Sequence, residues 1–527
     1  MKKLSLIEFG PIDANEPDPD FKNKYVEEEN FHILVDDKYR LITGEKGSGK
    51  SALIRGLLEK HKNNFTEKIN LDFSRDFEYL PIANNLLKIS ETIDFSTLSL
   101  MKKYWEYTIL IEVMKKIIAD KNFQLTIDET RIFEFLKKYK YINDTTFQRL
   151  LSISKEIWKM IKFGTDDQLP NNLNDNFPEK HDPDILNKLH LYPLETPEFI
   201  EIKKIFSEYL KNNNKKVLLT LDGLDVLKVT NISEQEKINI IFSGLVSGVY
   251  NLSIDKLFYK TVIVKALIPH DRWLGLDNIR DKDKYDKKRK KISWTYKNLQ
   301  VFLKKRIELS LDLDYTLTFD KAFGEIFPKN TPNEYIGIKE NTFEYYLRHT
   351  FYRPRHLQIH FEKLQEDYPD KIITTEMISE VLEESSEAIV GYILEEYKVD
   401  HSRLDEFIRS FRNKSNIWRY GDLYSFVQKI LSTMNIDYDP AKKIDSLYQI
   451  GFFGTKTNIN HHAKKEKYYR YRPPLKNKKI IPYQCNFQYI KPETHITHGA
   501  SDDMEFVIHP LFVEYCQLIP SKDFIIG

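Results

Sequence analysis

The residues best suited to chemistry lie near the start of the chain, where positions 44–51 read Gly-Glu-Lys-Gly-Ser-Gly-Lys-Ser. This is the P-loop pattern, in which glycines let successive backbone N–H groups turn towards the oxygens of a polyphosphate. We expect Lys50 to bridge the β- and γ-phosphates of ATP and the Ser51 hydroxyl to ligate Mg²⁺. A helix beginning here would point its positive dipole end at the same anion. The predicted nucleotide site comprises Gly44, Glu45, Lys46, Gly47, Ser48, Gly49, Lys50, Ser51 and Ala52.

A carboxylate suited to the same metal ion ends an apolar run at 216–222. Asp222 would hold Mg²⁺ opposite Ser51, directly or through water. Many P-loop ATPases place a water-activating acid at the next position, which is Gly223 in this chain. Asp225 is therefore the nearest carboxylate able to act as the catalytic base, although an acid at a helix start is also common without catalysis.

Polar residues that could sense the γ-phosphate follow a second apolar run at 261–268. His270, Asp271 and Arg272 are the candidates, and the sequence does not distinguish among them. The ordinary alternative for His270 is an imidazole that only satisfies its own hydrogen bonds.

Arginines flank Pro354 at a predicted helix start. Arg353 or Arg355, projected from a helical lid onto the γ-phosphate, would couple nucleotide state to the domain angle through directional charged hydrogen bonds. The alternative is a pair of solvated arginines. Arg272 and Arg306 remain candidates for an arginine that acts in trans across an oligomer.

Two basic stretches compete as contacts for nucleic acid. The first, at 282–291, is interleaved with aspartates and is partly self-neutralised. The second, at 456–479, surrounds Tyr468, Tyr469 and Tyr471, with Glu466 as its only acid. Cations with aromatic faces suit a wing lying along nucleic acid, whereas the alternative is a solvated β-hairpin.

The pattern of apolar residues predicts the elements that position these groups. Short extended runs at 39–43, 68–73, 216–222 and 261–268 predict strands, and the last two lack alternation, which is typical of parallel strands covered on both faces. Because helical patterns separate them, we predict an α/β fold with a parallel sheet and right-handed crossovers.

Helical patterns dominate the rest of the chain. They occur at 51–60, through a long insertion interrupted by an Asp-, Asn- and Pro-rich loop at 164–183, and at 295–309, 317–326, 340–350, 353–366, 375–398, 401–412, 420–434 and 441–450. The last three helices precede a predicted hairpin, which indicates a winged helix. The predicted domains are an N-terminal extension at 1–30, a core at 31–295 with a helical insertion at about 76–211, a helical lid at 296–400 and a winged-helix-like domain at 401–527.

Composition bounds the class of protein. The 527 residues include 80 Lys and Arg against 79 Asp and Glu, a formal net charge of +1, so no global field attracts nucleic acid. Only Cys485 and Cys516 are present, too few for a disulfide framework or a zinc ribbon. We find no signal peptide and no apolar run long enough to span a bilayer, and we expect a cytoplasmic protein with no membrane contact.

Several of these features together resemble a bacterial P-loop ATPase family of the AAA+, STAND and KAP neighbourhood. They are Phe9-Gly10 with Asp13-Ala14, residues 44–51, Asp222-Gly223-Leu224-Asp225, Ile292-Ser293-Trp294 with Arg306, and Arg353-Pro354-Arg355. The resemblance implies an additional-strand (ASCE) ATPase core, a lid with a sensor arginine and a C-terminal winged helix, as in initiator-type ATPases. Many relatives carry acids at the positions of Gly223 and Val226. Their absence in this chain argues against rapid ATP turnover.

Three functions are compatible with this pattern. The first is a Mg-dependent ATPase switch or motor that couples nucleotide state to nucleic acid or nucleoprotein through 456–479, works as a homo-oligomer, and acts in bacterial anti-phage defence as some relatives do. The alternative is a slow STAND-like signalling ATPase that oligomerises and binds protein partners. A P-loop kinase acting on a small acceptor fits the extra strand and the helical lid less well.

Overall fold

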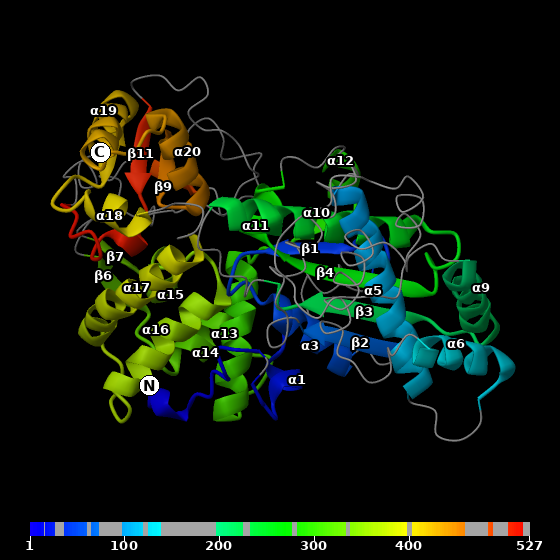
Figure 1. Cartoon of the computed structure of the whole chain (residues 1–527). Helices are drawn as coiled ribbons and strands as arrows, with labels where there is room; N and C mark the ends of the chain where they lie inside the picture. Colours follow the sequence, from blue (N-terminus) through cyan, green and yellow to red (C-terminus); the bar gives the residue numbers. More distant parts are fainter. Residues whose placement is uncertain are drawn as a thin grey trace, which may run out of the picture. The chain divides into compact units, whose positions relative to one another are not determined.

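The computed structural model describes residues 1–14, 16–26, 36–60, 65–72, 97–119, 125–138, 197–224, 232–276, 282–333, 338–397, 403–458, 483–487 and 504–519. The chain divides into two compact units (Figure 1). One, here called the sheet unit, comprises Glu27–Lys46 and Lys50–Ile292. The other, here called the helical unit, comprises Met1–Val26, Gly47–Gly49 and Ser293–Gly527.

A five-stranded parallel sheet is the centre of the sheet unit, with the order β2-β3-β4-β1-β5. Its strands are β1 (Leu41–Gly44), β2 (Glu67–Asp72), β3 (Val217–Asp222), β4 (Val262–Pro269) and β5 (Arg289–Lys291). The four strands predicted from apolar runs are confirmed. The short β5 was missed because its residues, Arg-Lys-Lys, carry no apolar signal.

The strand order decides which loops share an edge of the sheet. β4 lies between β1 and β3, with Thr43 beside Ile268 and Leu221 beside Ala266. Because all the pairs are parallel, the loop after β1 and the end of β3 lie at the same carboxyl edge. This additional strand between β1 and β3 confirms the predicted ASCE-type P-loop NTPase fold.

Seven helices of the sheet unit are described, and several of them pack on the strands. They are α3 (Lys50–Lys60), α5 (Thr97–Ala119), α6 (Ile127–Lys138), α9 (Pro197–Asn212), α10 (Ile232–Ile254), α11 (His270–Leu274) and α12 (Lys282–Asp286). α3 contacts β1, α10 contacts β4, and α5 contacts β2 and β3 (Figure 1). Every residue of β3 and β4 is buried, which accounts for the mostly apolar sequence of these strands, with Thr220, Asp222 and Lys265 as the polar exceptions.

The predicted helical insertion between β2 and β3 is confirmed by α5, α6 and α9, while the predicted loop at 164–183 lies outside the described residues. Glycines let α5 pack closely on α10. A Cβ at Gly244 would lie 2.4 Å from Met101 Cγ, and one at Gly248 would lie 3.0 Å from the Lys102 carbonyl oxygen. Larger residues at these two positions would push the helices apart.

The first part of the helical unit is a bundle with a small hairpin. Its helices are η1 (Leu4–Leu6), α1 (Phe21–Lys24), α13 (Tyr296–Leu311), α14 (Phe319–Gly324), α15 (Thr342–Arg348), α16 (Pro354–Asp367) and α17 (Thr375–Tyr397), and its strands are β6 (Asn330–Asn333) and β7 (Ile338–Asn341). All five helices predicted for the lid are confirmed. The antiparallel hairpin β6–β7 was not predicted.

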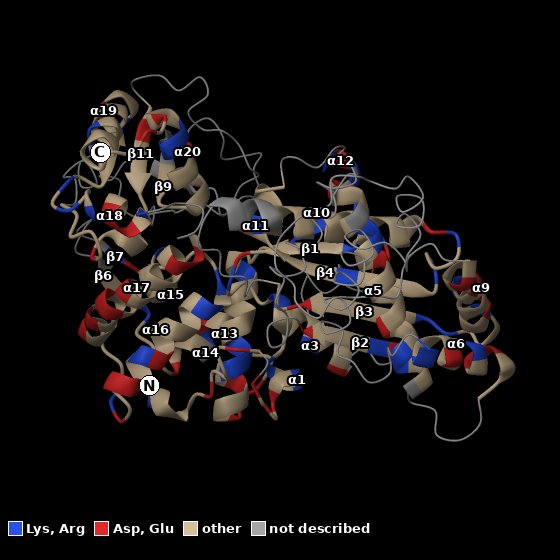
Figure 2. Cartoon of the chain, viewed as in Figure 1, with Lys and Arg blue, Asp and Glu red and all other residues tan. Residues whose placement is uncertain are grey.

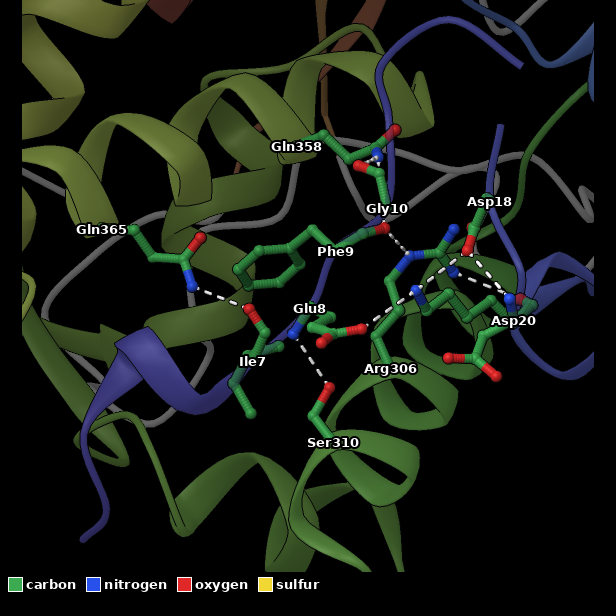
Figure 3. A network of polar contacts seen from close by, with 11 residues as sticks. Ile7, Glu8, Phe9, Gly10, Asp18, Asp20, Arg306, Ser310, Gln358 and Gln365 are labelled. Atoms are coloured by element: carbon green, nitrogen blue, oxygen red, sulfur yellow. Dashed lines mark hydrogen bonds and ion pairs between the residues drawn. The ribbon is translucent and has the colours of Figure 1, made fainter. Parts of the chain in front are cut away.

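The N-terminal residues are part of this bundle. Leu4, Ile7 and Phe9 are buried in the same core as α13 and α16, and the Phe9 ring stacks on Phe361 with centroids 5.2 Å apart. Polar groups secure the backbone, because Gln365 donates to the Leu4 carbonyl and to the Ile7 carbonyl (Figure 3).

Arg306 is the centre of the network that holds this segment (Figure 3). Its guanidinium donates from Nε to the Phe9 carbonyl at 2.8 Å, and from Nη1 to the Lys24 and Phe302 carbonyls at 3.2 and 3.0 Å. Burial lowers the pKa of Arg306 to about 9, and the charge of Asp18 opposes that effect. The carbonyl dipoles therefore compensate a buried cation.

Glu362 on α16 carries a half-buried carboxylate. Burial, followed by the charges of Glu366 and Glu16, raises the pKa of Glu362 to about 7. Most acids of α17, by contrast, are exposed, and Figure 2 shows acids along that helix. The exposed acids of α17 include Glu376, Glu380, Glu383, Glu384 and Glu387.

The second part of the helical unit has the element order helix, strand, helix, helix and three strands. These are α18 (Leu404–Arg409), β8 (Ile417–Arg419), α19 (Tyr420–Thr433), α20 (Pro440–Ile450), β9 (Phe453–Asn458), β10 (Tyr483–Phe487) and β11 (Glu505–Ile508), followed by η4 (Pro510–Phe512). The strands pair antiparallel in the order β10-β9-β11-β8. The three helices predicted after residue 400 are confirmed, although β8 was missed.

Within the residues that the structure describes, none of the helices is long and apolar enough to cross a bilayer.

Candidate functional site

The two ends of the P-loop belong to the sheet unit. β1 ends at Gly44 and α3 begins at Lys50, as the sequence predicted, so Ser51 and Ala52 lie in the first turn of α3. Lys50 is 7% exposed, and its Nζ donates to the carbonyls of Gly44 at 2.9 Å and Glu45 at 3.1 Å. The ammonium group is therefore held at the loop, where a phosphate could replace these carbonyl acceptors.

Glu45 places a buried carboxylate in the same loop. Its Oε1 lies 3.2 Å from Lys291 Nζ and 3.8 Å from His270 Nε2. Lys291 ends β5, and His270 begins α11 directly after β4. An acid beside a phosphate site needs a cation to offset its charge, and Lys291 supplies it. Sequence reasoning missed this role of Lys291, because a lysine within a basic run carries no specific signal.

The end of β3 carries the predicted metal carboxylate. Asp222 is 6% exposed, and its Oδ1 accepts a hydrogen bond from the Gly223 N–H at 2.8 Å. Gly223 has φ +73°, a conformation that a glutamate would adopt only with strain. The backbone thus gives a physical reason for glycine at a position where many P-loop ATPases carry an acid. Asp225, the predicted base, lies outside the described residues.

The predicted sensor candidates after β4 are all in the sheet unit. His270 is 5% exposed and Arg272 6% exposed, and Arg272 Nε lies 3.5 Å from Asp271 Oδ2. His270 is the candidate that the structure brings beside a P-loop residue, through Glu45. Arg272 is buried beside its neighbour Asp271, and its role in trans stays a prediction.

The tip of the P-loop, Gly47–Gly49, belongs to the helical unit. Gly47 and Gly49 have φ +77° and +85°, the left-handed conformation that glycine adopts without strain. Ser48 is 4% exposed, and within the described part of the chain its hydroxyl has no hydrogen-bond partner. Trp294 donates from Nε1 to the Ser48 carbonyl at 2.8 Å. A buried hydroxyl without a partner suggests that a ligand completes this tip.

One of the two predicted lid arginines lies at this tip. A Cβ at Gly47 would be 3.0 Å from Arg355 Cβ and 3.1 Å from its Cδ. The Arg355 Nε is buried and makes no hydrogen bond to another described residue. The Arg355 side chain therefore runs along the loop, and its Nε–H remains available to donate a hydrogen bond.

Arg353 is engaged elsewhere in the helical unit. Its Nη1 donates to Glu396 Oε2 on α17 at 2.8 Å, and both side chains are buried. Its guanidinium also lies 5.5 Å from the ring centroid of Phe351. The two arginines, equivalent in the sequence, are thus distinguished by the structure.

The turn before α16 holds both arginines in place. His356 Nδ1 accepts the Phe351 N–H at 3.2 Å, and Phe351 packs edge-on against His509 with centroids 4.8 Å apart. Burial, followed by the charge of Arg353, lowers the pKa of His356 well below its usual value. His356 is therefore a neutral acceptor that shapes the turn.

The remaining predicted contacts are Arg306 and the two basic stretches. Arg306, a candidate for action in trans, donates hydrogen bonds to carbonyls of the N-terminal segment, and its role in trans stays a prediction. Arg289 in the first basic stretch pairs with Asp286 at 2.7 Å, in keeping with self-neutralisation. Of the second stretch, residues 459–479 lie outside the described residues.

Comparison with known proteins supports the nucleotide-binding fold. Residues 40–243, less than half of the chain, match the family model described as the KAP family P-loop domain. No curated protein matches the chain.

Two solved structures are similar to the chain at low identity. The crystal structure of Cdc6p from Pyrobaculum aerophilum is 11% identical, covers 85% of this chain and 91% of its own length, and has a TM-score of 0.28. The structure of Drosophila ORC bound to DNA is also 11% identical, covers 92% of this chain and 87% of its own, and has a TM-score of 0.25.

Proposed function

We propose that this P-loop NTPase binds ATP with Mg²⁺ and hydrolyses it, as a switch whose nucleotide state is read by Arg355. The observation that carries the proposal is the tip Gly47–Gly49, where a buried hydroxyl and the Arg355 guanidinium both have hydrogen-bonding capacity left over among the described residues. ATP offers γ-phosphate oxygens as acceptors for such donors.

The donor set fits a magnesium ion. Ser51 lies in the first turn of α3, and the buried Asp222 lies at the end of β3. Both positions are at the carboxyl edge of the sheet. A hydroxyl and a carboxylate are the ligands that Mg²⁺ takes beside nucleotide phosphates. When bound, the ion neutralises charge on the β- and γ-phosphates. We propose Ser51 and Asp222 as its protein ligands and Asp225 as the base.

Replacement of Lys50 tests nucleotide binding. Lys50→Ala should abolish MgATP binding, whereas Lys211→Ala, an exposed lysine of α9 in the same unit, should leave it unchanged. Isothermal titration gives the affinity, and repeating it with EDTA tests the need for the metal. Equal affinities of Lys50→Ala and the wild type would contradict the proposal.

The arginines offer a matched pair. Arg355→Ala should keep binding and thermal stability but lower kcat by about tenfold or more, as removal of a charge from the γ-phosphate does. Arg353→Ala should instead lower the melting temperature, because it leaves Glu396 buried without its partner. Normal turnover in Arg355→Ala would refute the proposal that Arg355 reads the nucleotide state. Normal turnover in Asp225→Asn would refute the assignment of Asp225 as the catalytic base.

We further propose that the nucleotide state moves the lid (296–400) and the domain at 401–527 in a homo-oligomer that binds nucleic acid. The order of α18, β8, α19, α20, β9 and β11 supports a winged helix. Of α20, however, only Lys442 is exposed, and the acids of α17 would repel phosphate. The proposed contact is therefore the basic stretch 456–479.

Salt dependence tests this contact. Reversing Lys464, Lys465 and Lys467 to glutamate should weaken DNA or RNA binding and flatten its dependence on salt, whereas reversing Lys282 and Lys284 should not. ATP turnover with and without nucleic acid, across a salt series, measures the coupling.

The alternative function is a signalling ATPase that oligomerises and binds protein partners. Gly223 favours it, because the left-handed turn at this position excludes the usual acid and slows turnover. A chain that binds nucleotide but no DNA or RNA at low salt would support this alternative. Activity in anti-phage defence is a proposal for either function, and loss of protection in a Lys50→Ala strain would test it.

A further inference from the structure

Trp294 lies directly before a rigid helix, with its indole at the P-loop tip. The following residue, Thr295, caps α13 by accepting the Asn298 N–H at 3.1 Å. The indole packs edge-on against Phe302 of the same helix, with centroids 5.8 Å apart and the rings at 80°. Both contacts hold the indole in one place relative to α13.

The indole N–H has one acceptor, the Ser48 carbonyl at 2.8 Å. In a trans peptide the carbonyl of one residue and the N–H of the next point in opposite directions. A donor on the carbonyl side of the 48–49 peptide therefore fixes the Gly49 N–H on the other side. With Gly47 and Gly49 both left-handed, such N–H groups line the concave face of an anion-binding nest.

We propose that Trp294 is a positioning residue for phosphate binding, which aims the Gly49 amide at the nucleotide through its bond to the Ser48 carbonyl. This inference rests on the proposed function and adds a residue to it. The aromatic ring alone does not suffice. The ring atom nearest to Gly49, Cζ2, would be 3.7 Å from a Cβ there, an ordinary contact, so the N–H is the group that orients the peptide.

The test is Trp294→Phe, which keeps an aromatic ring against Phe302 and removes the N–H. One lost hydrogen bond that preorganises an amide should weaken MgATP binding about two- to tenfold. Tripolyphosphate serves as a competitor that lacks the nucleobase. Its affinity should fall by the same factor, because the Gly49 amide would contact phosphate.

Trp418→Phe is the matched control. Trp418 Nε1 also donates to a backbone carbonyl, that of Ser415, at 2.7 Å, and its ring stacks on Phe426. It lies in the same unit but in the 401–527 domain. Trp418→Phe should leave the affinities for MgATP and tripolyphosphate at the wild-type values, even where both variants lower the melting temperature.

Three outcomes decide the inference. Loss of affinity for both ligands in Trp294→Phe alone supports it. Wild-type affinity in Trp294→Phe, or loss for MgATP with unchanged tripolyphosphate competition, overturns it and leaves the proposed function standing. If the wild-type chain binds neither ligand, the proposed function itself fails, and the role of Trp294 fails with it.

Discussion

Replacement of Arg306 by methionine should release the N-terminal segment from the helical unit. Methionine keeps much of the buried volume but donates no hydrogen bonds. The carbonyls of Phe9 and Lys24 would lose a charged donor, whereas the Phe302 carbonyl lies within α13 and has the helix bond as well. At about 1.5–3 kcal/mol per hydrogen bond to a charged group, two bonds contribute roughly 3–6 kcal/mol.

Part of that sum is offset. Burial lowers the pKa of Arg306 to about 9, a sign that the cation is desolvated, and methionine removes this cost. We therefore expect a net loss of about 2–4 kcal/mol in the free energy of unfolding. Urea unfolding measures the loss, and hydrogen exchange should show faster exchange at the amides of residues 4–9.

An exposed arginine provides the comparison. Arg409 on α18 pairs with Asp405 at 2.8 Å at the surface, and Arg409→Met should cost less than about 1 kcal/mol. If Arg306→Met unfolds at the wild-type urea concentration and residues 4–9 keep their protection, the guanidinium does not hold the segment and the reasoning is wrong.

Two further substitutions test pH dependence and helix packing. Because the folded pKa of Glu362 is raised from 4.5 to about 7, its ionisation destabilises the fold as pH rises through that window. The partial exposure of Glu362 reduces this effect. Glu362→Gln should therefore raise the free energy of unfolding by about 1 kcal/mol at pH 8 and leave it unchanged at pH 4. Glu383→Gln, on the exposed face of α17, should show no such difference between the two pH values. Gly244→Ala should cost about 1–3 kcal/mol by pressing on Met101, whereas Gly391→Ala, with no atom within 4 Å, should stabilise α17 by up to about 1 kcal/mol in thermal or urea unfolding.

The parallel sheet was predictable because its central strands are buried on both faces. That burial demands mostly apolar residues without alternation, and β3 and β4 show them except at Thr220, Asp222 and Lys265. β5 and β8 have three residues each and carry Arg-Lys-Lys and Ile-Trp-Arg, so pairing with a neighbour, and not their own sequence, makes them strands.

The candidate site was predictable where chemistry depends on adjacent residues. Lys50 and Ser51 follow the loop that they serve, and a glycine pattern identifies them. Trp294 and Lys291 reach the loop from more than 240 positions away, through contacts that only the fold creates. Arg353 and Arg355 could not be distinguished from the sequence, because only the tertiary structure identifies a buried partner such as Glu396.

The long reach of the N-terminal contacts has a consequence during synthesis. Phe9 meets Arg306 across 297 positions, and Ile7 meets Gln365 across 358. At roughly 5–20 residues per second, about 15–70 seconds pass on the ribosome between translation of the first partner and the second. For that interval Leu4, Ile7 and Phe9 expose apolar surface with no core to enter. We expect the nascent chain to be a substrate for ribosome-associated chaperones until α16 emerges.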